Sequence, residues 1–144
     1  MKYLVLVSHG GFAAGLKSSL AMFAGDKMDQ VIATGLENGK SAAEFRDVFK
    51  EAISPIQAED EMVLLADIIG GSPLTTALDV LGEMNRLEST VVVGGMNLPM
   101  ALTAAVMKDA LDGDALATTL VSEATTALQQ FKATAEDADE EDDI

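Results

Sequence analysis

Four short apolar segments alternate with longer segments of helical character, and this alternation restricts the fold more than any other feature of the chain. The apolar segments cover residues 2–7, 30–34, 62–66 and 90–93 and are rich in Val, Ile and Leu. Strands that are largely apolar on both faces are typical of a parallel sheet covered by helices. We therefore expect an α/β fold in which strands and helices follow each other in turn.

The segments between the strands carry helical spacing and helix-start signals. Ser41 and Glu44 have the spacing of a capping box. Ser72 before Pro73 predicts a helix with Ser72 as its N-cap, which runs to about residue 84. Further helices are expected over residues 12–24, 97–110 and 114–132. The apolar helix faces are expected to contain Phe12, Leu16, Leu20, Phe23, Phe45, Val48, Phe49, Ile53, Leu116, Leu120, Ala124 and Leu128.

Right-handed crossovers make a doubly wound open sheet the expected topology, mainly parallel and with helices on both faces. The expected strand order is 2-1-3-4, because the chain winds one way to its second strand and returns to the other side for its third. This order places a switch point between strands one and three. Ligands bind in such folds at the carboxyl ends of the strands beside that point.

Length and charge divide the chain into one domain and a tail. We expect a single domain over residues 1–132. Residues 133–144 hold seven acidic residues and no basic one, which predicts an acidic, disordered tail. The whole chain has 24 acidic and 9 basic residues and a net charge of −15, so no nucleic-acid partner is expected.

Compartment and membrane association also follow from composition. The chain has no cysteine, which removes disulfides and thiol chemistry. No basic and apolar leader precedes the first strand, and no apolar run reaches the roughly 18–20 residues needed to span a bilayer. A cytoplasmic protein is therefore expected.

The single histidine of the chain, His9, directly follows the first strand. Asp67 follows the third strand, so the predicted strand order places the two residues opposite each other across the switch point. A carboxylate there can accept the N–H of one ring nitrogen and leave the other nitrogen as a nucleophile. The structural alternatives are a histidine that ends a strand and an aspartate that belongs to a turn.

Glycine turns follow the same two strands, with Gly10 and Gly11 in one turn and Gly70 and Gly71 in the other. Each turn leads into a helix N-terminus, where unpaired amides and the helix dipole favour an anion. We predict that these four glycines and Ser72 bind a phosphate group. Capping of its own helix is the commoner role of such a serine.

Several kinds of chemistry do not fit these residues. Neither GxxxxGK[ST] nor GxGxxG is present, so no nucleotide is expected, and one histidine without cysteine supplies no metal-ligand set. We expect neither a metal nor another cofactor. A hydrolase that uses Ser72 and His9 would lack the usual GxSxG elbow. Transfer of a phosphoryl group onto the imidazole remains, with a non-catalytic anion-binding or phosphoprotein-binding regulatory module as the alternative.

Three blocks of the chain, VLVSHGGFA at 5–13, ADIIGGSP at 66–73 and VVGGMNLPM at 92–100, resemble one known family. It is the IIA domain of the mannose-family (mannose, fructose and sorbose) phosphoenolpyruvate-dependent sugar phosphotransferase system, and the resemblance covers about residues 1–130. The resemblance implies that the phosphocarrier protein HPr phosphorylates His9 on its Nε2 side and that a IIB subunit accepts the phosphate. It also implies that Asp67 bonds the other ring nitrogen and that Ser72 lies by the phosphate.

The resemblance further implies a rim for partner docking and a set of partners. Asn97 and Pro99 would line the rim, and Met96 beside them is a further candidate, with core filling as its alternative. A homodimer is implied, often with a short antiparallel strand exchanged between subunits, as is indirect coupling to the membrane subunits IIC and IID. The phosphocarrier subunit of dihydroxyacetone kinase shares the fold, but the Gly-Gly-Ser-Pro block favours the sugar-transport branch.

Two features depart from the family pattern. Ile68 stands where some relatives have a polar residue, so the hydroxyl hydrogen bond of those relatives is not expected here. Some relatives continue through a linker into IIB, whereas this chain has an acidic tail. We therefore expect IIB to be a separate polypeptide.

Overall fold

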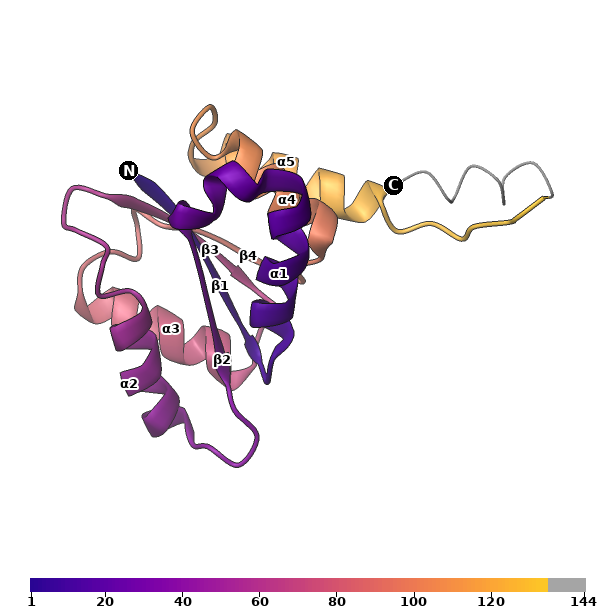
Figure 1. Ribbon diagram of the computed structural model, residues 1–144. Helices are drawn as coiled ribbons and strands as arrows, with labels where there is room; N and C mark the ends of the chain where they lie inside the picture. Colours follow the sequence, from indigo (N-terminus) through magenta and orange to yellow (C-terminus); the bar gives the residue numbers. More distant parts are fainter. Residues whose placement is uncertain (135–144) are drawn as a thin grey trace.

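A computed structural model describes residues 1–134 and contains a four-stranded sheet with helices on both faces (Figure 1). The strands are β1 (Lys2–His9), β2 (Val31–Leu36), β3 (Glu61–Ala66) and β4 (Val91–Gly94). Their order is β2-β1-β3-β4 and each pairing is parallel, which confirms the predicted topology. No antiparallel strand joins this sheet within residues 1–134.

The helices divide between the two faces of the sheet (Figure 1). One face is covered by α1 (Phe12–Ala24), α4 (Leu98–Met107) and α5 (Gly113–Thr126), with the 3-10 helix η1 (Gly25–Gln30) after α1. The other face is covered by α2 (Ala42–Ala52) and α3 (Ser72–Glu83). The chain therefore changes face twice, between α1 and α2 and between α3 and α4, as a doubly wound sheet requires.

The two central strands are buried on both sides. Leu4 and Leu6 of β1 pack into the core under α1, α4 and α5, and Val5 and Val7 pack into the core under α2 and α3. Each of these four side chains is fully buried. The absence of a polar face in this segment therefore reflects its position at the centre of the sheet.

The capping signals gave mixed results. Ser41 caps α2 as predicted, because its Oγ accepts the Glu44 backbone N–H at 3.1 Å. The prediction that Ser72 is an N-cap is wrong. Gly71 is the N-cap of α3 and Ser72 is the first helical residue, because the extended backbone of the loop ends at Gly71 (φ −86°, ψ 160°).

Four residues predicted on buried helix faces are instead exposed, namely Phe12 (49%), Phe23 (53%), Val48 (49%) and Leu128 (74%). The buried stripe of α1 consists of Ala13, Leu16, Leu20 and Ala24. Phe12 directly precedes Ala13 and Phe23 directly precedes Ala24, so both fall on the solvent side of the stripe. Leu128 is exposed because α5 ends at Thr126 rather than near residue 132.

Membrane-spanning length is not reached by any helix within residues 1–134. The acidic tail is predicted over residues 133–144, and of these, residues 135–144 lie outside the described residues. That tail and the domain boundary at residue 132 therefore stay predictions.

Candidate functional site

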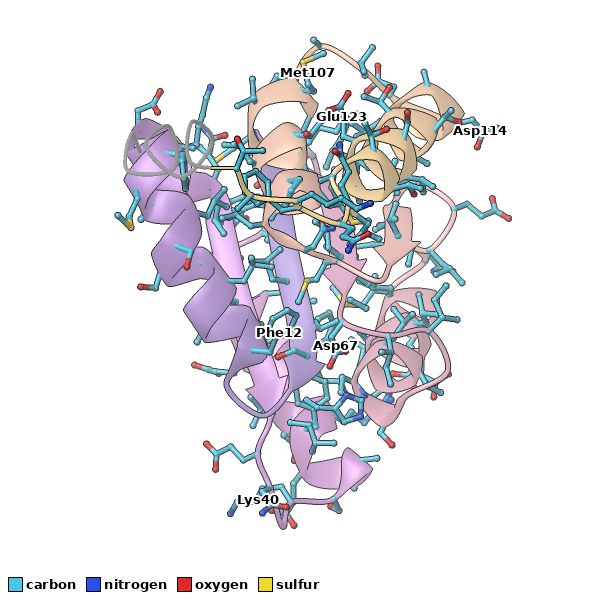
Figure 2. All side chains as sticks on the ribbon, turned by 90° about the vertical axis from the view of Figure 1, so that its right-hand side faces the viewer. Phe12, Lys40, Asp67, Met107, Asp114 and Glu123 are labelled. Atoms are coloured by element: carbon cyan, nitrogen blue, oxygen red, sulfur yellow. The ribbon has the colours of Figure 1, made fainter. Side chains whose placement is uncertain are left out.

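The parallel sheet brings His9 and Asp67 together at one edge. His9 is the last residue of β1, and Asp67 directly follows β3. The two strands are in register up to the pair Val7 and Ala66, and the Asp67 backbone N–H then donates to the Val7 carbonyl at 3.2 Å. Figure 2 shows Asp67 toward the opposite end of the molecule from Met107 and Asp114, which lie at the amino ends of the strands.

The Asp67 carboxylate binds both the backbone and the side chain of His9. Asp67 Oδ2 accepts the His9 backbone N–H at 2.9 Å and lies 2.8 Å from His9 Nδ1. Asp67 Oδ1 accepts the Ile68 backbone N–H at 2.9 Å. The carboxylate side chain is only 14% exposed, whereas the imidazole is 47% exposed. The carboxylate is thus held in place by the main chain while the ring it bonds is open to a partner.

The negative charge of Asp67 determines which nitrogen of the His9 ring carries the hydrogen. Partial burial is the largest single influence and raises the pKa of Asp67, but hydrogen bonds from the His9 backbone and ring and from the Ile68 backbone outweigh it. The pKa of Asp67 is therefore lowered, and the ionised carboxylate can only accept hydrogen bonds. In the neutral ring, Nδ1 then carries the hydrogen and Nε2 holds the free electron pair.

The Nε2 edge of the ring packs against the start of α3. A Cβ atom at Gly71 would lie 2.6 Å from His9 Cε1 and 3.2 Å from His9 Nε2. No side chain caps α3, and Pro73 has no amide hydrogen, so the Ser72 and Leu74 amides are the donors of its first turn. The structure thus places the predicted Gly71 against the Nε2 edge of the ring, with Ser72 as the next residue along the chain.

The other glycine turn is used differently from the prediction. The Gly10 amide donates to the Leu36 carbonyl at 2.7 Å, so it is not one of the unpaired amides on which the predicted phosphate binding depends. Gly11 is the N-cap of α1, and a Cβ there would meet nothing within 4 Å. In the turn that precedes α3, Gly70 has a φ of +88°, a conformation that favours glycine and turns the chain into the helix.

Ser8 is a residue of this site that sequence reasoning missed. Its side chain is fully buried, its Oγ accepts the Ala13 backbone N–H at 2.7 Å, and its hydroxyl donates to the Gly10 carbonyl at 3.4 Å. Ser8 thereby ties the turn after His9 to α1. A serine shortly before a helix is a capping signal, but three intervening residues separate Ser8 from the helix start.

Gly35 was also missed, because its role depends on strand pairing. It lies opposite Ser8 in the β1–β2 ladder, and a Cβ there would be 2.0 Å from the Gly10 carbonyl oxygen. Only glycine therefore leaves room for the Gly10 turn. No local signal in the sequence indicates this, since the two residues are distant along the chain.

The predicted docking rim is only partly at the surface. Met96 is 4% exposed and belongs to the core, which corrects its assignment to the rim and agrees with core filling. Asn97 is used within the fold, because its Oδ1 accepts the Met100 amide and its Nδ2 donates to the Ala124 carbonyl. Pro99 is partly exposed in the first turn of α4.

Apolar and uncharged residues surround His9 instead. Phe12, Ile68 and Ile69 are 49%, 53% and 78% exposed. Residues 9–12, 67–72 and 94–99, which form the turns after β1, β3 and β4, contain Asp67 as their single residue of type Asp, Glu, Lys or Arg, whereas the turn after β2 holds Glu37 and Lys40. Within residues 1–134, no three or more His, Cys, Asp and Glu side chains gather in a way that could hold a metal ion.

Comparison with known proteins agrees with this geometry. Over residues 3–121 the chain matches the family described as the PTS (phosphotransferase system) fructose IIA component. The fructose-specific EIIA component of Bacillus subtilis (strain 168) is 28% identical over 108 residues, which are 75% of this chain and 71% of that protein.

Solved structures give the same result. The mannose/sorbose-specific IIA subunit of the phosphotransferase system from Enterococcus faecalis aligns with a TM-score of 0.77 and 26% identity, over 93% of this chain and 98% of that chain. The PTS IIA protein associated with the fucose utilization operon from Streptococcus pneumoniae aligns with a TM-score of 0.70 and 28% identity, over 90% and 92%. Because the family match spans most of the sequence, the chain belongs to the PTS system fructose IIA component family.

Proposed function

We propose that this protein is a cytoplasmic phosphoryl carrier of a sugar phosphotransferase system. It accepts a phosphoryl group from phosphorylated HPr on His9 Nε2 and passes it to a IIB subunit. The observation that carries this proposal is the contact of 2.8 Å between Asp67 and His9 Nδ1, with Nε2 turned toward the uncapped start of α3. Membership of a IIA family supports a role in phosphoryl transfer.

The transfer step follows from this geometry. The electron pair of Nε2 attacks phosphorus in line as the P–N bond to the donor histidine breaks. Positive charge that develops on the His9 ring is stabilised by Asp67, which keeps the Nδ1 hydrogen in its hydrogen bond. The first-turn amides of α3 and the Ser72 hydroxyl stabilise the negative charge of the transferring group. Transfer to IIB is the same step in reverse.

The surroundings of His9 suit a protein as donor and acceptor. The imidazole is 47% exposed, and the turns after β1, β3 and β4 carry no basic side chain. The exposed Phe12 offers apolar area next to it, as the centres of protein interfaces do. A small-molecule substrate would instead favour an enclosed pocket. No hydrogen bond joins the Ser72 hydroxyl to His9 within the described residues, so nothing favours a serine hydrolase.

The direct test is stepwise phosphoryl transfer in vitro. We expect incubation with phosphoenolpyruvate, enzyme I and HPr to add one phosphoryl group, which is acid-labile and maps to His9 by mass spectrometry. Addition of the cognate IIB should then remove it. Stable non-covalent phosphate binding without covalent label would instead support a regulatory module, and transfer only to dihydroxyacetone kinase subunits would support that system.

The family resemblance also carries the proposals of a homodimer and of indirect coupling to IIC and IID. Light scattering after size-exclusion chromatography tests the first of these. Sugar uptake by cells that lack the protein tests the second.

Substitution of Gly71 by alanine is expected to displace the His9 ring. The Gly71 backbone (φ −86°, ψ 160°) accepts alanine without strain, but the new Cβ would collide with His9 Cε1. We expect phosphorylation to slow by roughly tenfold or more, since small misplacements of a reacting group are costly. Gly15→Ala, within α1, is the control, because a Cβ there is also in open space. Equal phosphorylation rates for the two variants would show that the ring contact is unimportant.

Substitution of Ser72 by alanine should have a smaller effect. The hydroxyl does not cap α3, so we expect a change in unfolding free energy within about 0.5 kcal/mol. Backbone donors remain, and the phosphorylation rate should fall by roughly two- to fivefold, about half to one kcal/mol in transition-state energy. Thr75→Ala, at an exposed position one turn later, is the control. Rates that do not differ between the two variants would remove Ser72 from the site.

A further inference from the structure

We propose that the Ile68 side chain shields phosphorylated His9 from water and so lengthens the lifetime of the phosphohistidine. The inference rests on the proposed function, because it concerns the phosphoryl group carried by Nε2. It concerns a different property, however, since loss of the group to water needs no partner protein.

The position of Ile68 is defined by the space in front of Gly71, at the start of α3. Ile68 Cδ1 would lie 3.3 Å from a Cβ atom at Gly71, and His9 Nε2 would lie 3.2 Å from that same atom. The Ile68 methyl group and the nucleophilic nitrogen therefore border one small space. A phosphoryl group on Nε2 stands beside this space, and Ile68 covers it with hydrocarbon.

The main chain holds Ile68 at this place. Its backbone N–H donates to Asp67 Oδ1 at 2.9 Å, and the same carboxylate bonds the His9 ring. Ring, carboxylate and Ile68 thus form one connected unit. The Ile68 side chain is nevertheless 53% exposed, although the burial of such a side chain would be favourable. An exposed apolar group next to a reactive bond is suited to excluding water from it.

The reaction that Ile68 slows is simple hydrolysis. The water oxygen bonds to phosphorus as the P–Nε2 bond breaks, and the electron pair of that bond returns to Nε2. Both hydrogens of the water remain on the phosphate, which leaves as dihydrogen phosphate, and the ring becomes neutral with its Nδ1 hydrogen still bonded to Asp67. Exclusion of water from a reactive intermediate is a known use of apolar side chains in active sites.

Ile69 provides a matched control within the same turn. Its side chain is 78% exposed and lies against Gly94, where a Cβ would be 2.2 Å from Ile69 Cγ1. Ile69 therefore extends toward the β4 side of the edge, whereas Ile68 extends toward the His9 ring. Truncation of either residue removes similar apolar bulk from the same turn.

The experiment measures the lifetime of the isolated phosphoprotein. The affinity-tagged protein is phosphorylated by phosphoenolpyruvate, enzyme I and HPr, separated from them, and followed at neutral pH by intact-mass spectrometry. We expect Ile68→Ala to shorten the half-life of the phosphoryl group roughly threefold or more. Ile68→Val, which removes Cδ1 alone, should shorten it less, Ile68→Leu should preserve it, and Ile69→Ala should match the wild type.

Each other result has a distinct meaning. Equal half-lives for wild type and both Ile68→Ala and Ile68→Val would overturn the shielding role, as would equal shortening by Ile69→Ala. Should Ile68→Ala disturb the fold by circular dichroism, Ile68→Val decides the matter. Failure of the wild-type protein to form any phosphohistidine would refute the proposed function itself, and the shielding role with it.

Discussion

Substitution of His9 by alanine should abolish covalent phosphorylation, with label below roughly 1% of wild type, because it removes the Nε2 electron pair that is the nucleophile in the proposed function. The chain has no second histidine and no cysteine that could take over. Label is measured after incubation with phosphoenolpyruvate, enzyme I and HPr. Transfer onward to IIB should be lost to the same extent.

The fold should survive this substitution, which makes the result interpretable. His9 is a half-exposed side chain, and Asp67 keeps two backbone donors, the amides of His9 and Ile68, when the ring is removed. We expect the unfolding free energy to fall by no more than about 1.5 kcal/mol, the typical worth of one hydrogen bond. Stoichiometric label on a folded His9→Ala protein would disprove the phosphohistidine.

Replacement of Asp67 by asparagine should slow phosphorylation of His9 by roughly 10²–10⁴-fold, the range for loss of an orienting or acid–base group. Asparagine preserves the shape of the side chain but removes its charge. The ring then loses the acceptor that assigns its hydrogen to Nδ1 and the charge that stabilises the phosphorylated ring. Single-turnover kinetics with phosphorylated HPr measures the rate. A wild-type rate would reduce Asp67 to a turn residue.

The same variant allows a separate test by pH. The pKa of Asp67 is lowered in the folded protein, because hydrogen bonds from His9 and Ile68 outweigh the effect of its burial. Its ionised form therefore stabilises the fold above its unfolded pKa of about 4. That contribution is lost as the pH falls through the lowered folded pKa. Denaturant unfolding should show wild type more stable than Asp67→Asn at neutral pH, with the difference shrinking in acid below about pH 4.

A constant stability difference across this acid range would mean that ionisation of Asp67 does not stabilise the fold. Asp79→Asn is a suitable control, since Asp79 lies on the exposed side of α3. Its stability should follow the wild-type curve.

The sequence alone was sufficient for the topology and for the pair at the centre of the site. Alternation of apolar strands with helices is a local pattern, and right-handed crossovers leave few orders for four parallel strands. The order β2-β1-β3-β4 was therefore predictable, and with it the meeting of His9 and Asp67. Capping by Ser41 was predictable for the same reason, because donor and acceptor lie within one helical turn.

Tertiary structure decided which of the two glycine turns reaches the ring and which apolar residues stay exposed. The Gly10 amide bonds Leu36 on β2, and Gly71 packs against the His9 ring. Met96 is buried, while Ile68 stands in solvent beside the ring. Local pattern specifies which residue types a turn contains, but amide partners and side-chain packing depend on contacts between segments that are distant along the chain. Composition and spacing therefore predicted that His9 and Asp67 meet, and only the packing of the turns determined what surrounds them.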